Sequence, residues 1–196
     1  MSISSHTTAR PQTGRTIALV AVFAAFIAVC ALLPAFPVGP AGVPITFQTL
    51  AIYLTALILG GKRGFAATAL YVVVGLIGVP VFAGGAGGFG VLAGPSAGYL
   101  LAFAPAAALI GALAFVFLKR TRATGTRFGL LLVATLAGSA LITLWGIVGM
   151  MINASLSLHA AVSVALIYLP GDLIKSVLAI IIATAVHRAF PALAHS

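Results

Sequence analysis

The chain has 196 residues, of which 62% are apolar and only 6% are charged, and its mean hydropathy of +1.26 excludes a soluble globular domain. Its net charge is +9, with a single acidic residue in the whole sequence. Because the basic residues are scattered between long apolar stretches, without interleaved aromatic residues, the composition predicts a membrane protein with several spans and excludes a nucleic-acid-binding domain.

Six apolar stretches are candidates for helices that cross a bilayer core of about 30 Å, which takes about 20 residues. In chain order they cover residues 16–36, 44–59, 65–82, 97–118, 128–151 and 170–187. The expected fold class is therefore all-α integral membrane, with six transmembrane helices in one membrane domain over residues 16–188. Polar tails are expected at 1–15 and 189–196. The first stretch is longer than a usual signal-peptide core and lacks a polar cleavage region, so we expect a retained helix.

The basic residues predict the orientation of these helices. Lys and Arg collect on the cytoplasmic flanks of membrane helices, and here they occupy alternate boundaries. The nine cations outside the apolar stretches are Arg10, Arg15, Lys62, Arg63, Lys119, Arg120, Arg122, Arg127 and Arg188. The three remaining loops carry no charge. We therefore expect both termini to be cytoplasmic and the loops near 37–44, 84–99 and 153–169 to lie on the outer side.

The only carboxylate, Asp172, lies in an apolar stretch three residues before Lys175. Pro170 suits the first turn of a helix and disrupts an interior turn, so we expect the last helix to begin there. Asp172 would then lie in the first turn at the outer end, and residues 153–169 would form a short helix or lid. The i, i+3 spacing places both charged side chains on one face.

This pair has two interpretations. It is either a mutual ion pair that neutralises both groups, or a binding site, because ionisable residues in membrane segments usually mark a substrate path. One anion and one cation suit a small, mostly apolar ligand with urea-like or amide groups.

A glycine-rich loop over residues 84–99 is expected on the same side as Asp172. Its glycines permit positive φ and close backbone approach to a ligand, although the loop could also be a flexible turn. Gln48 either lies at the level of this site or bonds a neighbouring helix. Tyr99, Tyr168 and Trp145 either contact a ligand or serve packing and interfacial roles. The candidate ligand contacts in the loop are Gly85, Gly87, Gly88 and Phe89.

Two motif matches in this loop point to other classes of protein. Residues 85–90 match G-x-G-x-x-G, but they follow a membrane helix and no acidic residue lies about 20 residues further on, so dinucleotide binding is excluded. Residues 94–98 match G-x-S-x-G, and with Ser96, His159 and Asp172 they make an intramembrane serine hydrolase a remote alternative. No metal is expected, because no His pair has metal-ligand spacing and Cys30 is alone.

The first predicted helix carries two overlapping pairs of small residues, Ala21 with Ala25 and Ala24 with Ala28. Small residues let another helix approach closely in lipid, and that helix is either internal or part of another subunit. The chain has no P-loop and no series of buried carboxylates for ion coupling. Energy for transport would therefore come from elsewhere, or the protein only binds or facilitates.

Three segments together resemble the BioY family, the biotin-binding S components of energy-coupling factor (ECF) transporters. They are Val-Pro-Ile-Thr-Phe-Gln-Thr-Leu at 43–50, the loop at 84–99 and Leu-Pro-Gly-Asp-Leu-Ile-Lys at 169–175. The resemblance covers residues 15–188. It implies six helices in a bacterial plasma membrane, high-affinity capture of biotin from the outer face, and no catalytic residue or cofactor in this chain. It also implies docking on a T component with paired ATPases that hydrolyse ATP, partly through Ala-x-x-x-Ala on the first helix.

The resemblance further implies that Asp172 and Lys175 contact the ligand. The ureido N–H groups of biotin suit Asp172, and Lys175 suits either the ureido carbonyl or the valerate carboxylate. The glycine-rich loop would then occlude the ligand before the whole domain reorients. The alternatives are an S component for another small vitamin, or a secondary carrier. The chain departs from the family pattern at Gly138-Ser139, where Gly-Asn is frequent, so the contacts of the fifth predicted helix stay open.

Overall fold

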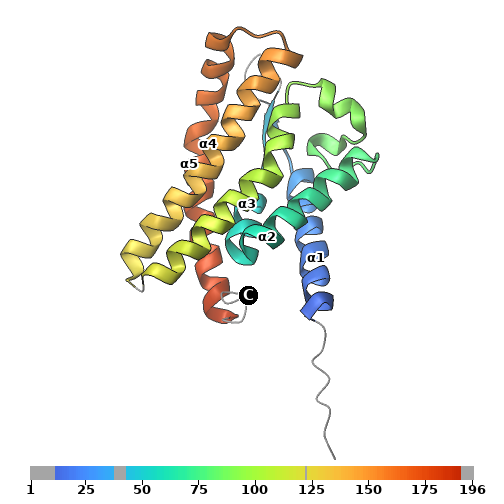
Figure 1. Ribbon diagram of the computed structural model, residues 1–196. Coiled ribbons are helices and arrows are strands. Elements are labelled where there is room, and N and C mark those ends of the chain that lie inside the picture. Colours follow the sequence, from blue (N-terminus) through green and yellow to red (C-terminus); the bar gives the residue numbers. More distant parts are fainter. Residues whose placement is uncertain (1–11, 38–42, 122, 191–196) are drawn as a thin grey trace, which may run out of the picture.

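The computed structural model describes residues 12–37, 43–121 and 123–190 of the chain. Expectations for most of both polar tails, for Arg10, for Arg122 and for the middle of the loop at 37–44 lie outside the described residues. Figure 1 shows a bundle of long helices with one irregular loop region. The helices are α1 (Gln12–Leu32), α2 (Gln48–Leu76), α3 (Ala97–Arg120), α4 (Thr124–Asn153) and α5 (Leu158–Ala189).

Two loop regions connect the first three helices. Before α2, the strands β1 (Phe36–Pro37) and β2 (Pro44–Ile45) pair antiparallel over two residues each. Between α2 and α3, the glycine-rich loop contains two short 3-10 helices, η1 (Ala83–Gly85) and η2 (Phe89–Ala93). The predicted loop is therefore irregular as expected, but locally folded.

All five helices are long and apolar enough to cross a membrane. Large apolar side chains point outward from the bundle, for example Ile17, Leu101 and Val133, which a soluble helix bundle would bury. The described part of the chain is therefore a multi-pass membrane domain. Helices α3 and α4 begin and end within four residues of the predicted 97–118 and 128–151.

Helix α2 covers most of the second and third predicted helices, 44–59 and 65–82, but it begins at Gln48 and ends at Leu76, so residues 77–82 belong to the following loop and not to a helix. It is assigned as helical from Gln48 to Leu76 but breaks at Gly60, whose φ of 78° and ψ of 177° are not helical. The predicted count of six is therefore not confirmed: the described chain has five apolar spanning helices, one of them broken. A φ of this sign is open to glycine and costly for other residues.

Close packing accompanies the break in α2. Gly111 of α3 packs directly on the peptide unit between Gly60 and Gly61, so a side chain on Gly111 would collide with backbone atoms. At the end of α5, the ring nitrogen Nε2 of His187 lies 3.0 Å from the carbonyl oxygen of Leu57, in the helical turn before the break. The break is thus held by contacts from α3 and α5.

Helix α5 contradicts the prediction for the last helix. It runs from Leu158 to Ala189 without a non-helical residue, although it contains Pro170. The expected lid at 153–169 is wrong, because most of that segment is helix, and only residues 154–157 connect α4 to α5. Asp172 is not in a first turn but about 21 Å along the axis from Leu158. Membrane helices tolerate an interior proline because nearby groups satisfy the freed carbonyl, and Pro170 faces outward.

The core lies around the N-terminal half of α2, where every residue from Ala51 to Gly60 is buried. Helix α3 packs against α2 and α4, and α5 packs against the same two helices. In Figure 1 the glycine-rich loop and the α4–α5 connection lie toward one end of the bundle. The opposite end holds the start of α1, the α3–α4 connection and the end of α5, which carry Arg15, Lys119, Arg120, Arg127 and Arg188.

Candidate ligand-binding site

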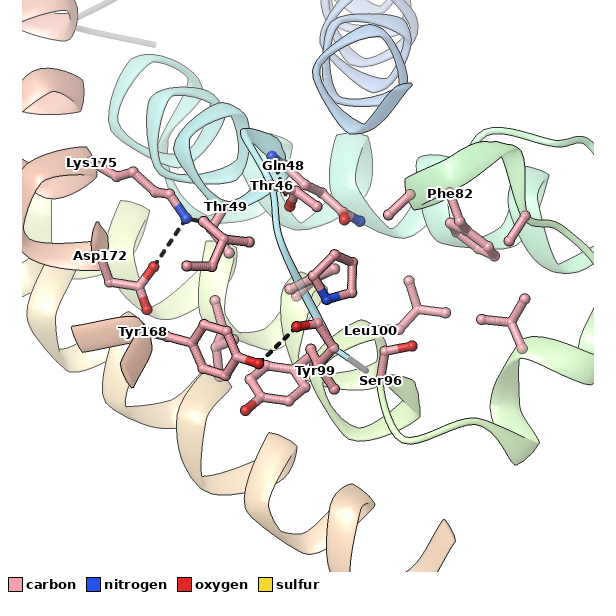
Figure 2. A pocket seen from close by; sticks show the side chains of 18 residues that line it. Thr46, Gln48, Thr49, Phe82, Ser96, Tyr99, Leu100, Tyr168, Asp172 and Lys175 are labelled. Atoms are coloured by element: carbon pink, nitrogen blue, oxygen red, sulfur yellow. Dashed lines mark hydrogen bonds and ion pairs between the residues drawn. The ribbon is translucent and has the colours of Figure 1, made fainter. Parts of the chain in front are cut away.

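A cavity of about 330 Å³ lies between α2, α3, α5 and the loops that precede α2 and α3 (Figure 2). Small-molecule sites have volumes of about 300–1,000 Å³. Most of its lining is apolar or aromatic. The polar lining residues are Thr46, Gln48, Thr49, Ser96, Tyr99, Tyr168, Asp172 and Lys175. Three segments far apart in the sequence therefore contribute polar groups to one cavity.

Asp172 and Lys175 form an ion pair on one side of this cavity (Figure 2). The Lys175 Nζ atom lies 3.3 Å from Asp172 Oδ1 and donates to Thr49 Oγ1 at 2.9 Å. The two side chains are only 14% and 12% exposed. An ammonium group has three donors, and a carboxylate has about four acceptor positions. The pair therefore retains a donor and acceptor positions for a ligand, and the prediction that both residues share one face of a helix is confirmed.

Tyr99 and Tyr168 make an aromatic wall of the cavity. Their rings pack edge to face, with centroids 6.3 Å apart and an interplanar angle of 78°. The Tyr168 hydroxyl donates to the carbonyl oxygen of Val43 at 2.7 Å, which ties α5 to the segment before α2. The sequence left open whether these tyrosines face a site or the membrane interface, and the structure places both beside the cavity.

Gln48 lies at the other side of the cavity from Asp172 (Figure 2). Its Nε2 atom donates to the Tyr71 hydroxyl at 2.8 Å, and that hydroxyl donates to the carbonyl oxygen of Val81 at 3.2 Å. Its backbone N–H bonds Thr46 Oγ1 at 3.3 Å. Gln48 thus lines the cavity and also bonds a residue further along α2, so the two roles considered for it are compatible.

The glycine-rich loop is hydrogen-bonded to α2 and to α4. Gly88 N–H donates to the carbonyl oxygen of Gly75 at 2.7 Å. At the end of α4, the Asn153 Nδ2 atom donates to the carbonyl oxygens of Leu92 at 2.8 Å and Gly94 at 2.9 Å. These hydrogen bonds hold η2 against α4 and the start of the loop against α2, so the loop has a defined position over the cavity.

Several predicted site residues do not line the cavity. The loop contacts come from Ala83, Ala86 and Val91. Phe89 is 69% exposed, and Trp145 is 49% exposed on the outer face of α4. The residues brought together are Asp172, Lys175, Gln48 and Tyr99. Those left outside the lining are Gly85, Gly87, Gly88, Phe89 and Trp145.

The small residues of α1 divide between two faces. Ala24 is buried and Ala28 packs against the hydrophobic core, so this pair serves packing within the chain. Ala21 and Ala25 are exposed. Of the two pairs, only Ala21 and Ala25 therefore leave an exposed small-residue face on α1.

The serine hydrolase alternative has no support in the geometry. Ser96 lines the cavity and precedes the first turn of α3, as expected, but its side chain makes no capping hydrogen bond. His159 is exposed near the start of α5, about 20 Å along the helix axis from Asp172. The three side chains do not form a relay. No group of His, Cys or acidic residues suited to a metal ion occurs within the described ranges.

Reasoning from the sequence missed the residues that support the site, above all Thr49 and Tyr71. Both are ordinary polar residues of an apolar helix, and only their neighbours in space show their role. Ser139 is also buried, next to Asp172, at the position where the family pattern departs. An intramembrane hydroxyl was the one signal that could have pointed to it.

An all-helical membrane domain with a largely apolar cavity and a buried ion pair defines a membrane protein with an internal site for a small molecule. The BioY family model matches residues 4–192 of this chain. The chain therefore belongs to the BioY family.

Individual relatives agree with this assignment. The biotin transporter BioY of Rhodobacter capsulatus is 35% identical over 159 residues, which cover 76% of this chain and 82% of the relative. The biotin transporter BioY of Lactococcus lactis is 32% identical, with 74% and 76% covered. The crystal structure of the S-component for biotin from an ECF-type ABC transporter superposes with a TM-score of 0.81 at 29% identity, covering 90% of this chain and 93% of that one.

Proposed function

We propose that this protein is a biotin-binding S component of an ECF transporter, a transport subunit and not an enzyme, with its ligand in the cavity beside Asp172 and Lys175. The observation that carries the proposal is the buried ion pair in the wall of a 330 Å³ cavity, in a member of the BioY family. Biotin has a ureido ring and a carboxylate separated by apolar carbons. The cavity offers polar groups on two sides and aromatic and apolar lining between them.

Each polar residue has a proposed role in binding. Asp172 accepts hydrogen bonds from the ureido N–H groups, and Lys175 donates to the ureido carbonyl or pairs with the valerate carboxylate. Gln48 and Tyr99 complete the polar contacts. Gly85, Gly87, Gly88 and Phe89 act as a cover beside the lining residues and close the cavity after the ligand enters. The position of Trp145 does not favour a ligand contact.

Transport requires partners in this proposal. Ala21 and Ala25 form the exposed small-residue face of α1 that a T component approaches, and paired ATPases supply energy by hydrolysing ATP. The protein lies in the bacterial plasma membrane with both termini cytoplasmic, which agrees with the basic residues at one end of the bundle. Six membrane segments result if the two halves of α2 are counted separately.

Radiolabelled biotin binding to the purified full chain in detergent tests the proposal. Saturable binding that excess unlabelled biotin displaces, and that an unrelated vitamin such as thiamine does not, is the expected result. Absence of binding by a monodisperse protein contradicts the biotin assignment and favours another vitamin as ligand. Uptake into proteoliposomes that a proton gradient drives without ATPases would instead favour a secondary carrier.

A further inference from the structure

Tyr71 lies just outside the cavity but joins two parts of its wall. The residue is in the second half of α2, is 1% exposed and is absent from the lining. Its hydroxyl accepts a hydrogen bond from Gln48 Nε2 at 2.8 Å and donates one to the Val81 carbonyl at 3.2 Å. Gln48 lines the cavity, and Val81 directly precedes the lining residues Phe82 and Ala83.

The donors and acceptors around the Tyr71 hydroxyl fix the orientation of the Gln48 amide. A tyrosine hydroxyl has one proton. The Val81 carbonyl can only accept, so this proton is committed to it, and toward Gln48 the hydroxyl can only accept. Gln48 must therefore turn its NH₂ group toward Tyr71. Its carbonyl oxygen and its second N–H remain for the cavity, although the last torsion of a glutamine side chain is otherwise roughly two-fold.

The Tyr71 hydroxyl itself is held in place. The Tyr71 ring packs edge to face on Phe82, with centroids 5.5 Å apart and an interplanar angle of 85°. Phe82 is 3% exposed and occupies the space beside Gly75, where any side chain would collide with its ring. The position of the hydroxyl is thus set by the packing between α2 and the start of the glycine-rich loop.

We propose that Tyr71 is a positioning residue for ligand binding, which presets the Gln48 amide from outside the cavity. This inference rests on the proposed function, because biotin is the ligand whose binding reports it. A side chain that is already oriented loses less conformational entropy when the ligand binds. Loss of one such hydrogen bond changes an equilibrium by about 3- to 10-fold.

A double-mutant cycle on the purified full chain tests the proposal, with biotin dissociation constants measured for wild type, Tyr71→Phe, Gln48→Met and the double variant. Tyr71→Phe keeps the ring and its contact with Phe82, and we expect affinity to fall about 3- to 10-fold. In the Gln48→Met background the same change should alter affinity by less than about twofold, because the residue that it positions is gone. Thr68→Val is the matched control: it removes another fully buried hydroxyl from α2, and we expect wild-type affinity.

Gln48→Glu gives an independent route if Tyr71→Phe elutes as an aggregate. A carboxylate cannot donate to Tyr71, so this variant loses the amide-to-hydroxyl hydrogen bond, and the hydroxyl can bond the carboxylate only by turning its proton away from the Val81 carbonyl. It should therefore bind biotin at least as weakly as Tyr71→Phe. Wild-type affinity in Gln48→Glu, or an equal effect of Tyr71→Phe in both backgrounds, would overturn the positioning role and leave biotin binding intact. Failure of the wild type to bind biotin would overturn the proposed function and this inference with it.

Discussion

Neutralising Asp172 and Lys175, singly and together, separates a ligand-binding role from mutual charge compensation. Asp172→Asn keeps the shape of the side chain and an acceptor for Lys175, whose Nζ also stays bonded to Thr49 at 2.9 Å. It turns a charged hydrogen bond to the ligand, which contributes about 1.5–3 kcal/mol, into a neutral one, which contributes about 1 kcal/mol, so the expected loss is about 0.5–2 kcal/mol. We therefore expect biotin to bind about 2- to 30-fold more weakly.

Lys175→Met alone leaves a carboxylate that is 12% exposed without its cation. Removing one partner of a buried pair costs about 3–5 kcal/mol, whereas replacing both by neutral groups is often harmless to stability. The double variant Asp172→Asn with Lys175→Met should consequently unfold at a temperature close to that of wild type, while its biotin affinity stays at least as low as that of Asp172→Asn.

The assay pairs equilibrium binding of radiolabelled biotin with thermal unfolding of the same detergent-purified samples. A stable double variant with weak binding supports direct ligand contact by the pair. A stable double variant with wild-type affinity would refute the reasoning, because the two charges would then serve only to neutralise each other.

Three further outcomes follow from the structure. Gly111→Ala should lower the free energy of unfolding by about 1–3 kcal/mol, since the added methyl group meets backbone atoms of α2. Gly129→Ala is the control, because nothing lies within 4 Å of the added methyl group there. Equal melting temperatures for the two variants would contradict the expected packing clash at Gly111. Asn153→Ala removes two hydrogen bonds to the glycine-rich loop, so biotin should dissociate about 5- to 30-fold faster, and an unchanged rate would mean that the loop does not retain the ligand. Ala21→Leu with Ala25→Leu should abolish copurification with the ECF partners while biotin affinity is kept, and retained copurification would place the docking face elsewhere.

The sequence predicted those helices whose apolar stretch ends sharply at proline or charged residues. Helix α3 begins after Pro95-Ser96 and ends at Lys119-Arg120, and both ends match the prediction within two residues. Asp172 and Lys175 were found because charges are rare in apolar stretches. By contrast, the sequence left two roles open for Gln48, a place at the site or a bond to a neighbouring helix, since an amide in a membrane helix bonds readily to neighbours of many kinds.

One helix boundary was misjudged because a rule from aqueous proteins was applied inside a bilayer. Pro170 suggested a helix start, but an interior proline is tolerated in membrane helices, and α5 passes through it. Near Gly60 the predicted boundary between two helices coincides with a kink of non-helical φ and ψ, after which the chain continues as helix. Both outcomes depend on contacts with other helices, and these are not encoded in local sequence.

The outward position of Trp145 has a practical consequence for spectroscopy. It is the only tryptophan of the chain, and its indole, which is 49% exposed, lies outside the cavity lining. The tryptophan fluorescence of this protein therefore comes from one site that faces the surrounding lipid or detergent. Quenching by brominated lipids would report the surroundings of α4, and an emission change on adding ligand would report movement of that helix and not contact with the ligand.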